Sequence, residues 1–430
     1  MEPKNPLCFA LALFFSAIIF WPAGRVTSFG INYGRIGNNL PAPETAVRLV
    51  KCTGATKVKL YDADPNVLRA FANTGVELII SVGNERLPEM KDCDKAQDWV
   101  DQSVRPFLPA TKITAVIVGN EVLSSSAAAA PRHQDLLPAM QNVYYALQTR
   151  NLSSQIRVTT AHSLAVLETS YPPSSGVFRK NLTQDFLCEI LGFLNSTGSP
   201  FYINAYPYFA AKADPEHVKL DYALSNPNSG VTDDHTHLHY DNLLYAQIDA
   251  VYAASAQLGY GSVCVEVSET GWPSKGDSDE TSATQQNARA YNGNLLSLLA
   301  EKKRTPLTPA NCGMDAFLFA LFNENMKPGP TSERNYGLFN ADGSPSYDLG
   351  FAACGMNAGN DSGSCRPVGG VMPQPPATNQ TAWSPWNSYM SITSDAVQVR
   401  PPRLCSKWMC SIIALGFLCT LHYGRKIPAL

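Results

Sequence analysis

The sequence has no concentrated block of Lys or Arg. Its 430 residues include 33 Lys and Arg against 36 Asp and Glu, which leaves a formal net charge of −3. Proteins that bind nucleic acid need a concentrated basic surface to contact the phosphates. The absence of such a block excludes nucleic acid as the main partner, and an uncharged polymer fits this charge balance better.

Cysteine pairs with the spacing of metal sites are also absent. The 11 cysteines contain no Cys-x-x-Cys pair, and their spacing predicts neither a zinc site nor a disulfide framework. Cys354 and Cys365 are close enough in sequence to close one small loop in an oxidising compartment. We interpret the segment with alternating His235, His237 and His239 as a polar loop, and we expect no metal and no cofactor.

The N-terminal segment has the pattern of a secretory signal. Lys4 precedes an apolar stretch over residues 7–20, and Val26 and Ser28 are small residues at a suitable cleavage site, so residues 1–28 are predicted to be a signal peptide. An N-terminal membrane anchor fits less well, because the apolar run is shorter than the roughly 20 residues of a bilayer span. Five glycosylation sequons agree with secretion as a glycoprotein, outside the cell or in the cell wall. They begin at Asn151, Asn181, Asn195, Asn360 and Asn379.

The composition changes after Gly355. Residues 356–403 are rich in Gly, Pro, Ser and Asn and lack helical or strand periodicity, so we expect a disordered, flexible linker. Residues 404–430 form a short hydrophobic tail. Three interpretations of the tail stay open: an imperfect glycolipid-anchor signal for attachment to the outer face of the plasma membrane, a membrane-associated tail, or an unremarkable variable terminus.

Between these ends, short apolar runs bounded by turn residues alternate with segments of helical periodicity. The predicted strands are residues 29–34, 57–61, 77–82, 115–118, 156–160, 201–206, 263–267 and 315–322. The predicted helices are residues 43–52, 65–73, 96–108, 134–150, 185–194, 241–258 and 283–301. Eight strands in alternation with helices, without a glycine-rich phosphate loop, predict an α/β fold with one (β/α)8 barrel over residues 29–355 rather than an open doubly wound sheet.

Acidic residues follow several of the predicted strands. Catalytic groups of a (β/α)8 barrel project from the C-terminal ends of its strands, where this sequence has Glu85, Glu121, Glu269 and Glu324. Two carboxyl groups that face each other across the barrel mouth suit cleavage of a glycosidic bond, because one protonates the departing oxygen while the other attacks or stabilises the sugar. If the alternation of the seventh strand places Glu269 inside the barrel, Glu266 is expected to point toward the helices.

Six segments carry motifs that occur together in one family: Gly30-Ile31-Asn32-Tyr33-Gly34-Arg35, Lys59-Leu60-Tyr61-Asp62, Val118-Gly119-Asn120-Glu121-Val122, Asn204-Ala205-Tyr206-Pro207, Val267-Ser268-Glu269-Thr270-Gly271-Trp272-Pro273-Ser274 and Phe322-Asn323-Glu324-Asn325. They resemble the plant β-1,3-glucanases of glycoside hydrolase family 17, and the resemblance runs from about Phe29 to Gly355. The segment around Glu269 is highly specific for that family, whereas Val-Gly-Asn-Glu occurs twice in this chain, at residues 82–85 and 118–121.

The resemblance implies the roles of the two principal carboxyl groups. The family places its general acid and base after an Asn at the end of the fourth strand, which selects Glu121 and leaves Glu85 as a loop carboxylate. Glu269 is then the nucleophile. Because neighbouring residues of a regular strand face opposite ways, Asn120 and Glu121 can both line the site only if the strand end is distorted, and we predict a bulge there.

The resemblance also implies supporting residues. Glu324, Lys327 and Glu333 match a charged cluster beside the nucleophile, in which Lys327 would keep Glu269 ionised; a salt-bridge network at the barrel rim is the alternative. The hydroxyls of Tyr33 and Tyr206 are expected near the nucleophile, with ordinary packing as the alternative. Trp272, inside the specific motif, is included among the supporting or substrate-binding residues.

The expected activity is the endo-acting, retaining hydrolysis of internal bonds in β-1,3-glucans such as callose or fungal wall glucan, by a monomer. Retention implies carboxyl groups about 5 to 5.5 Å apart. Two alternatives are a glucan-remodelling transglycosylase, in which a sugar replaces water as the acceptor, and a non-catalytic glucan-binding cell-wall protein.

Overall fold

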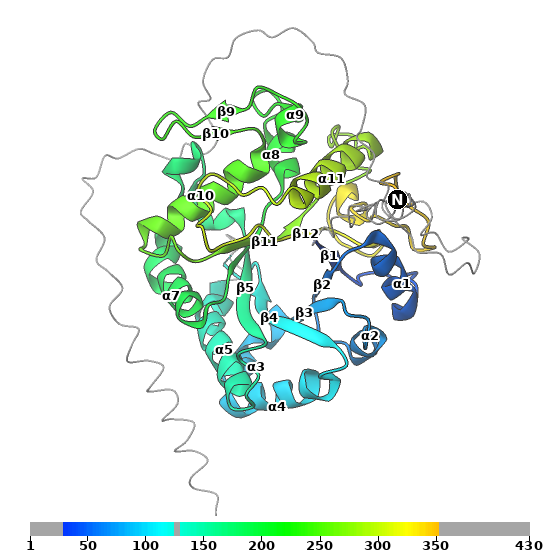
Figure 1. The fold of residues 1–430 in the computed structure, drawn as a ribbon, viewed down its shortest axis with the longest axis vertical. Helices are drawn as coiled ribbons and strands as arrows, with labels where there is room; N and C mark the ends of the chain where they lie inside the picture. The colour runs from blue at the N-terminus through cyan, green and yellow to red at the C-terminus, as the bar shows by residue number, and fades with distance from the viewer. Residues whose placement is uncertain (1–28, 124–129, 352–430) are drawn as a thin grey trace, which may run out of the picture.

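The computed structural model describes residues 29–123 and 130–351 (Figure 1). Eight parallel strands close into a barrel in the order β1, β12, β11, β8, β5, β4, β3, β2. The strands are β1 Gly30–Tyr33, β2 Lys57–Leu60, β3 Glu77–Val82, β4 Lys112–Asn120, β5 Arg157–Ser163, β8 Phe201–Asn204, β11 Val265–Thr270 and β12 Ala316–Leu318. Each overlaps one predicted strand, so the predicted (β/α)8 barrel is confirmed.

Several predictions concern residues outside the described ranges. These are the signal peptide 1–28, the boundary at Gly355, the linker 356–403, the tail 404–430, the pair Cys354 and Cys365, and the sequons at Asn360 and Asn379.

Helices surround the barrel (Figure 1). The longer ones are α1 Pro43–Thr53, α4 Cys93–Ser103, α5 Ala130–Gln148, α7 Cys188–Thr197, α10 Leu243–Gln257 and α11 Gln285–Ala300, and the shorter ones are α2 Pro65–Ala70, α3 Leu87–Met90, α6 Lys180–Leu182, α8 Pro207–Ala213 and α9 Leu220–Ala223. Side-chain caps fix several starts: the carboxylate of Asp92 accepts hydrogen bonds from two backbone N–H groups of α4. That cap explains why α4 begins at Cys93, before the predicted 96–108.

In the described part of the chain, buried apolar residues form three clusters: a small one consists of Tyr222, Tyr240, Tyr245 and Ala246, and the other two pack on the barrel strands. The larger one fills the space between the sheet and the helices and includes Leu78, Ile80 and Val82 of β3. The smaller one comes from the opposite faces of the strands, where side chains meet inside the barrel. It consists of Ile79, Ala115, Ile117, Ala161, Tyr202 and Phe317.

The prediction that Glu266 points toward the helices is wrong. The Arg157 guanidinium contacts the Glu266 carboxylate at 3.3 Å, and the Tyr202 hydroxyl, from the inner cluster, also bonds to it. The register between β11 and β8 shifts between Val267 and Glu269. This irregularity breaks the two-residue alternation, so Glu266 and Glu269 both lie on the barrel side of β11.

The structure adds features that periodicity did not predict. Two antiparallel ribbons pair β6 Leu167–Thr169 with β7 Val177–Phe178 and β9 Val231–Thr232 with β10 His239–Tyr240; Figure 1 shows the second ribbon at the periphery. A disulfide joins Cys264 to Cys312, two cysteines 48 residues apart. The prediction that the cysteines form no disulfide framework was therefore wrong, because the fold brings distant cysteines together. Within the described ranges, no helix is long and apolar enough to cross a membrane.

Candidate active site

The end of β4 is distorted as predicted. Its register against β5 shifts between Ile117 and Asn120, and Gly119 and Glu121 both have left-handed backbone conformations, with φ of 73° and 55°. Only glycine adopts such a conformation at little cost, and a Cβ on Gly119 would also approach Val122 to 2.6 Å. The distortion lets Asn120 and Glu121 line the same pocket.

Asn84 fixes this distorted segment from the neighbouring strand. The Asn120 backbone N–H donates to Asn84 Oδ1 over 2.8 Å, and Asn84 Nδ2 donates to the Asn120 carbonyl over 2.8 Å. Asn84 belongs to the Val-Gly-Asn-Glu at residues 82–85. Its side chain supports the backbone of the other copy, at residues 118–121. Glu85 is exposed and does not line the pocket.

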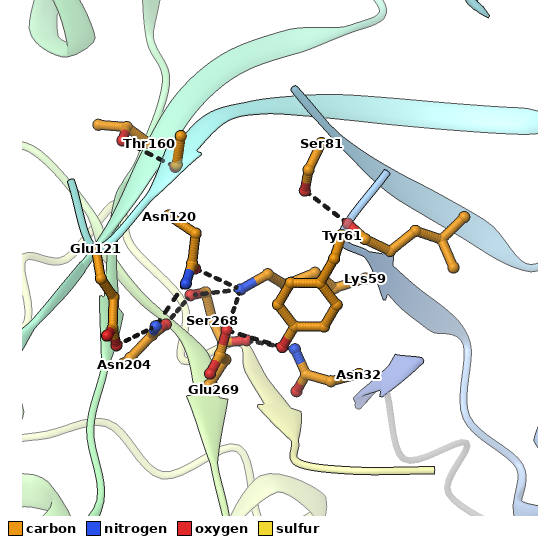
Figure 2. A network of polar contacts seen from close by, with 12 residues as sticks. Asn32, Lys59, Tyr61, Ser81, Asn120, Glu121, Thr160, Asn204, Ser268 and Glu269 are labelled. Atoms are coloured by element: carbon orange, nitrogen blue, oxygen red, sulfur yellow. Dashed lines mark hydrogen bonds and ion pairs between the residues drawn. The ribbon is translucent and has the colours of Figure 1, made fainter. Parts of the chain in front are cut away.

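Glu121 is a partly buried carboxyl group with one amide donor. Asn204 Nδ2, at the end of β8, donates to Glu121 Oε1 over 2.8 Å (Figure 2). Burial raises the pKa of Glu121 above its ordinary 4.5, and the negative charge of Glu269 raises it further. Both effects favour the protonated form that a proton donor requires.

Glu269 has the opposite electrostatic environment. Lys59 Nζ lies 2.7 Å from Glu269 Oε1, and the Tyr61 hydroxyl donates to the same oxygen over 2.8 Å. The Tyr206 hydroxyl donates to Oε2 over 3.0 Å. Burial acts to raise the pKa of Glu269, but the Lys59 ammonium and the hydrogen bonds outweigh it, so the pKa lies below 4.5. The carboxylate is therefore held ionised, as a nucleophile requires.

A continuous polar network joins the two carboxyl groups (Figure 2). Lys59 Nζ donates to Ser268 Oγ over 3.3 Å, the Ser268 hydroxyl donates to Asn204 Oδ1, and the Asn204 amide donates to Glu121. Lys59 also contacts Asn120 Oδ1 at 3.3 Å. Four strands of the barrel thus contribute to one hydrogen-bonded unit beneath the pocket.

The direct counter-ion of Glu269 is Lys59, and the predicted Lys327 lowers the pKa of Glu269 only as a more distant charge. Lys327 Nζ lies 3.7 Å from Glu324 Oε2 and 4.0 Å from the centre of the Phe319 ring, so its direct partners are these two residues. Its effect on the pKa of Glu269 is weaker than that of Lys59. Lys59 and Tyr61 were overlooked, although both belong to a quoted motif and Lys59 projects from a strand into the barrel.

The charged cluster lies at one wall of the pocket. Glu324 is 3% exposed, and its Oε1 accepts a hydrogen bond from the Ile36 N–H over 2.7 Å. Its carboxylate packs against Gly34, where a Cβ would lie only 2.5 Å from the carboxylate oxygens. Burial raises the pKa of Glu333, which the charge of Lys327 opposes. The pocket is lined by Gly34, Arg35, Ile36, Tyr61, Asn120, Glu121, Tyr206, Phe209, Glu269, Phe319, Glu324, Lys327, Glu333 and Tyr336.

Two predicted site residues lie elsewhere. Tyr33 is 2% exposed and packs edge-to-face against Phe322, and it does not line the pocket. Trp272 is fully buried, and its indole N–H donates to the Ser282 carbonyl over 2.8 Å. Both belong to the larger apolar cluster, Tyr33 from the end of β1 and Trp272 from the segment that follows β11. Among the described residues, no group of three or more His, Cys, Asp or Glu side chains is arranged to hold a metal ion.

Comparisons with known proteins agree with this geometry. The family described as glycosyl hydrolases family 17 matches residues 29–351. Glucan endo-1,3-beta-glucosidase 11 of Arabidopsis thaliana is 54% identical over 351 residues, which cover 81% of this chain and 80% of that relative. The solved structure of CJP38, a β-1,3-glucanase and allergen of Cryptomeria japonica pollen, has a TM-score of 0.71 and 41% identity and covers 75% of this chain and 99% of that chain. A structure from a study of two plant β-glucan endohydrolases with distinct substrate specificities has a TM-score of 0.67 and 34% identity, over 74% of this chain and 99% of that chain.

Proposed function

The chain belongs to glycosyl hydrolase family 17, and on that premise we propose that Glu121 is its general acid and base and Glu269 its nucleophile. The enzyme hydrolyses internal β-1,3-glucosidic bonds of β-1,3-glucans. One observation carries the assignment of roles: in a single pocket, the pKa of Glu121 is raised while that of Glu269 is lowered. Two carboxyl groups whose environments separate their pKa values in this way divide into an acid and a nucleophile.

In the first half of the reaction, a carboxylate oxygen of Glu269 forms a bond to the anomeric carbon of the sugar. The bond from that carbon to the glycosidic oxygen breaks, and the oxygen takes the proton of Glu121. The product is a glycosyl ester on Glu269 with inverted configuration. Glu121 is left as a carboxylate.

In the second half, Glu121 accepts a proton from a water molecule that attacks the anomeric carbon. The bond from carbon to Glu269 breaks, and its electron pair returns to the carboxylate. Two inversions restore the β configuration of the substrate. The asymmetric environment suits both halves, because Glu121 gains a proton more readily than Glu269 does.

The pocket wall supports a sugar polymer as substrate. Tyr206, Phe209 and Tyr336 bring aromatic rings to the pocket, and Phe209 is 44% exposed. Flat aromatic faces pack against the apolar faces of sugar rings. These three rings therefore offer surface against which sugar units of the substrate can pack.

Product analysis tests this function. Linear β-1,3-glucan incubated with the enzyme should yield short oligosaccharides whose new reducing ends appear first as the β anomer by NMR. Release of glucose alone would contradict endo action, and an α anomer as the first product would contradict a double displacement. A parallel incubation with mixed-linkage glucan determines how far the enzyme tolerates β-1,4 bonds.

We also propose that the enzyme is a secreted glycoprotein of the extracellular space or cell wall. The N-terminal signal pattern supports this, as do the exposed sequon residues Asn151, Asn181 and Asn195 and the Cys264–Cys312 disulfide, since disulfides persist in oxidising compartments. Expression of the full chain in plant cells should give a product that loses mass on treatment with an N-glycosidase. Retention of the enzyme on the cell surface, with release by a phosphoinositide-specific phospholipase, would assign the tail 404–430 as a glycolipid-anchor signal.

A monomer is sufficient for this chemistry, and we propose that the enzyme acts as one. One barrel supplies both Glu121 and Glu269 together with the residues that hydrogen-bond to them. Light scattering coupled to size-exclusion chromatography should give the mass of one glycosylated chain.

A further inference from the structure

Lys59 is a buried, charged residue whose presence the roles of the two glutamates do not explain. It projects from β2 into the barrel, and its side chain has no exposed surface. A buried ammonium is costly unless it is paired and hydrogen-bonded. Each of its three protons has an acceptor: Glu269 Oε1 at 2.7 Å, and Ser268 Oγ and Asn120 Oδ1 at 3.3 Å each.

The two oxygens of Glu269 are held unequally, and Figure 2 shows Lys59 and Tyr61, the two donors to one of them. Oε1 accepts from the Lys59 ammonium and from the Tyr61 hydroxyl at 2.8 Å. Oε2 accepts from a single neutral donor, the Tyr206 hydroxyl, at 3.0 Å. Charge-assisted hydrogen bonds are the stronger ones. The lone pairs of Oε1 are thus occupied by two donors, whereas Oε2 keeps one free to attack.

We propose that Lys59 is a positioning residue for the nucleophile, which holds Glu269 Oε1 through both halves of the reaction while Oε2 forms and breaks the bond to the sugar. This inference rests on the proposed role of Glu269 as nucleophile. Lys59 keeps its proton throughout.

The chemistry assigns Lys59 a different effect in each half. Before attack, the ammonium keeps the carboxylate ionised and oriented. In the ester, Oε1 is the carbonyl oxygen and carries little charge, so its bond to Lys59 weakens. When water displaces the ester, negative charge returns to the carboxylate, and the ammonium stabilises that leaving group as the charge develops.

The strand offers a matched control. Lys57 lies two residues before Lys59 on the same face of β2, and it forms an ion pair with Asp315 rather than with Glu269. Lys57→Met therefore removes an inward lysine from the same strand without touching the site. Comparison of the two variants separates the local effect on Glu269 from a general loss of charge inside the barrel.

The first experiment measures both kcat and kcat/KM for Lys59→Met, Lys59→Arg and Lys57→Met with two substrates, because kcat/KM reports formation of the ester and kcat also reports its hydrolysis. One is linear β-1,3-glucan, and the other is a dinitrophenyl β-laminaribioside, whose leaving group needs no proton from Glu121. Removal of a donor of this kind lowers the rate by about 10²- to 10³-fold. We expect Lys59→Met to lose that factor with both substrates, and Lys57→Met to stay within about threefold of wild type.

The pH profile with the dinitrophenyl substrate provides a readout that a structural role would not change. The titratable and charged groups that face Glu269 are Lys59, Tyr61, Glu121, Tyr206, Lys327 and Glu333. Without the Lys59 ammonium, the pKa of Glu269 rises, so the acidic limb of kcat/KM should move to higher pH. Lys59→Arg retains the charge and should leave that limb near its wild-type position even if its larger side chain lowers kcat.

Two results of these measurements would overturn the proposed role of Lys59. If Lys59→Met cleaves the dinitrophenyl substrate at the wild-type rate, Lys59 acts through Glu121. If the acidic limb of its kcat/KM profile stays at the wild-type pH, Lys59 does not influence the ionisation of Glu269. Either result overturns the proposal. If Lys59→Met does not fold, Lys59→Gln compared with Lys59→Arg measures the same limb. Labelling of the wild-type enzyme with a 2-deoxy-2-fluoro laminaribiosyl fluoride tests the role of Glu269 separately from that of Lys59. A label on a residue other than Glu269 would refute the assignment of Glu269 as the nucleophile.

A crystal structure of that trapped ester tests the choice of oxygen. We expect the sugar on the oxygen that faces Tyr206, with Lys59 Nζ still within hydrogen-bond distance of the carbonyl oxygen. An ester through the oxygen that Lys59 and Tyr61 hold would overturn the assignment.

Discussion

Asn84 and Asn120 are bound to each other twice, because the side chain of Asn84 both accepts from the backbone N–H of Asn120 and donates to its carbonyl, each over 2.8 Å. The pair spans the ends of β3 and β4 at the point where β4 leaves regular geometry. The side chain of Asn84 thus replaces strand partners that the distorted backbone cannot use. Glu121 follows directly, so its position depends on this pair.

Replacement of Asn84 by Ala should misplace Glu121 and leave Glu269 intact. Loss of two backbone partners is expected to cost about 1 to 3 kcal/mol of stability, and a small displacement of the acid should lower kcat on β-1,3-glucan by roughly 10- to 100-fold. A dinitrophenyl glycoside should be cleaved nearly as fast as by wild type. Glu85→Gln, at the exposed neighbour, is the control and should change neither rate. Equal losses on both substrates would show that Asn84 supports the nucleophile instead.

The raised pKa of Glu121 predicts a change of stability with pH. A carboxyl group whose pKa is higher in the folded state than the ordinary 4.5 favours folding most below pH 4.5, and that contribution is lost as pH rises through the folded pKa. Glu121→Gln removes the ionisation, so the variant should melt at a higher temperature than wild type at pH 7 and lose this advantage at pH 4. Thermal melts at both values check it. A variant that is less stable at pH 7 would contradict the raised pKa.

Glu280 should support the pocket wall through its buried carboxylate. It is 2% exposed and accepts from Lys212 Nζ at 2.7 Å and Ser332 Oγ at 2.6 Å, and Ser332 precedes Glu333. Burial acts to raise the pKa of Glu280, but these donors lower it to about 2. The stabilisation is therefore present above pH 4.5 and lost as pH falls toward 2.

Glu280→Gln should accordingly unfold at lower urea concentration than wild type at pH 7, by about 1 to 3 kcal/mol, and the difference should shrink at pH 3. KM for β-1,3-glucan should rise as the wall loosens. The control is Asp279→Asn, since the Asp279 carboxylate lies 3.7 Å from the same Lys212 ammonium but is 74% exposed. An equal loss of stability in both variants would assign the effect to Lys212 alone.

The C-terminal segment should be separable from catalysis. The family match ends at residue 351, and no residue after Gly355 belongs to a catalytic motif. A chain truncated near Gly355 should hydrolyse soluble β-1,3-glucan with a kcat close to that of the full chain. A folded truncation with a large loss of kcat would show that the segment after residue 355 helps to build the site.

The sequence predicted the barrel and its two principal glutamates because both leave strong local signals. Each strand is a short apolar run, and the segment around Glu269 has a specific motif. Alternation failed where the backbone is irregular: the register shift between Val267 and Glu269 leaves Glu269 on the same side of β11 as Glu266. Distant contacts left no local signal, so the Cys264–Cys312 pair was missed.

The supporting residues were harder to assign, for a different reason. A lysine on a strand is normally solvated, and nothing within the motif of Lys59 indicates that its ammonium faces a glutamate 210 residues later. Tyr33 and Tyr61 both lie at strand ends near the mouth of the barrel. Only the structure separates the core position of Tyr33 from the hydrogen bond of Tyr61 to Glu269.

Chemical rescue with azide tests the division of roles between Glu269 and Glu121 most directly. In Glu269→Ala, a small anion can occupy the vacated position and attack the sugar from the side of the nucleophile, so azide should restore some cleavage of a dinitrophenyl β-laminaribioside and give an α-glycosyl azide. In Glu121→Ala, azide should attack the trapped ester on Glu269 and give the β-glycosyl azide. NMR of the two products decides the matter: α from Glu269→Ala with β from Glu121→Ala is the predicted result, and the reverse pattern would contradict the assignment.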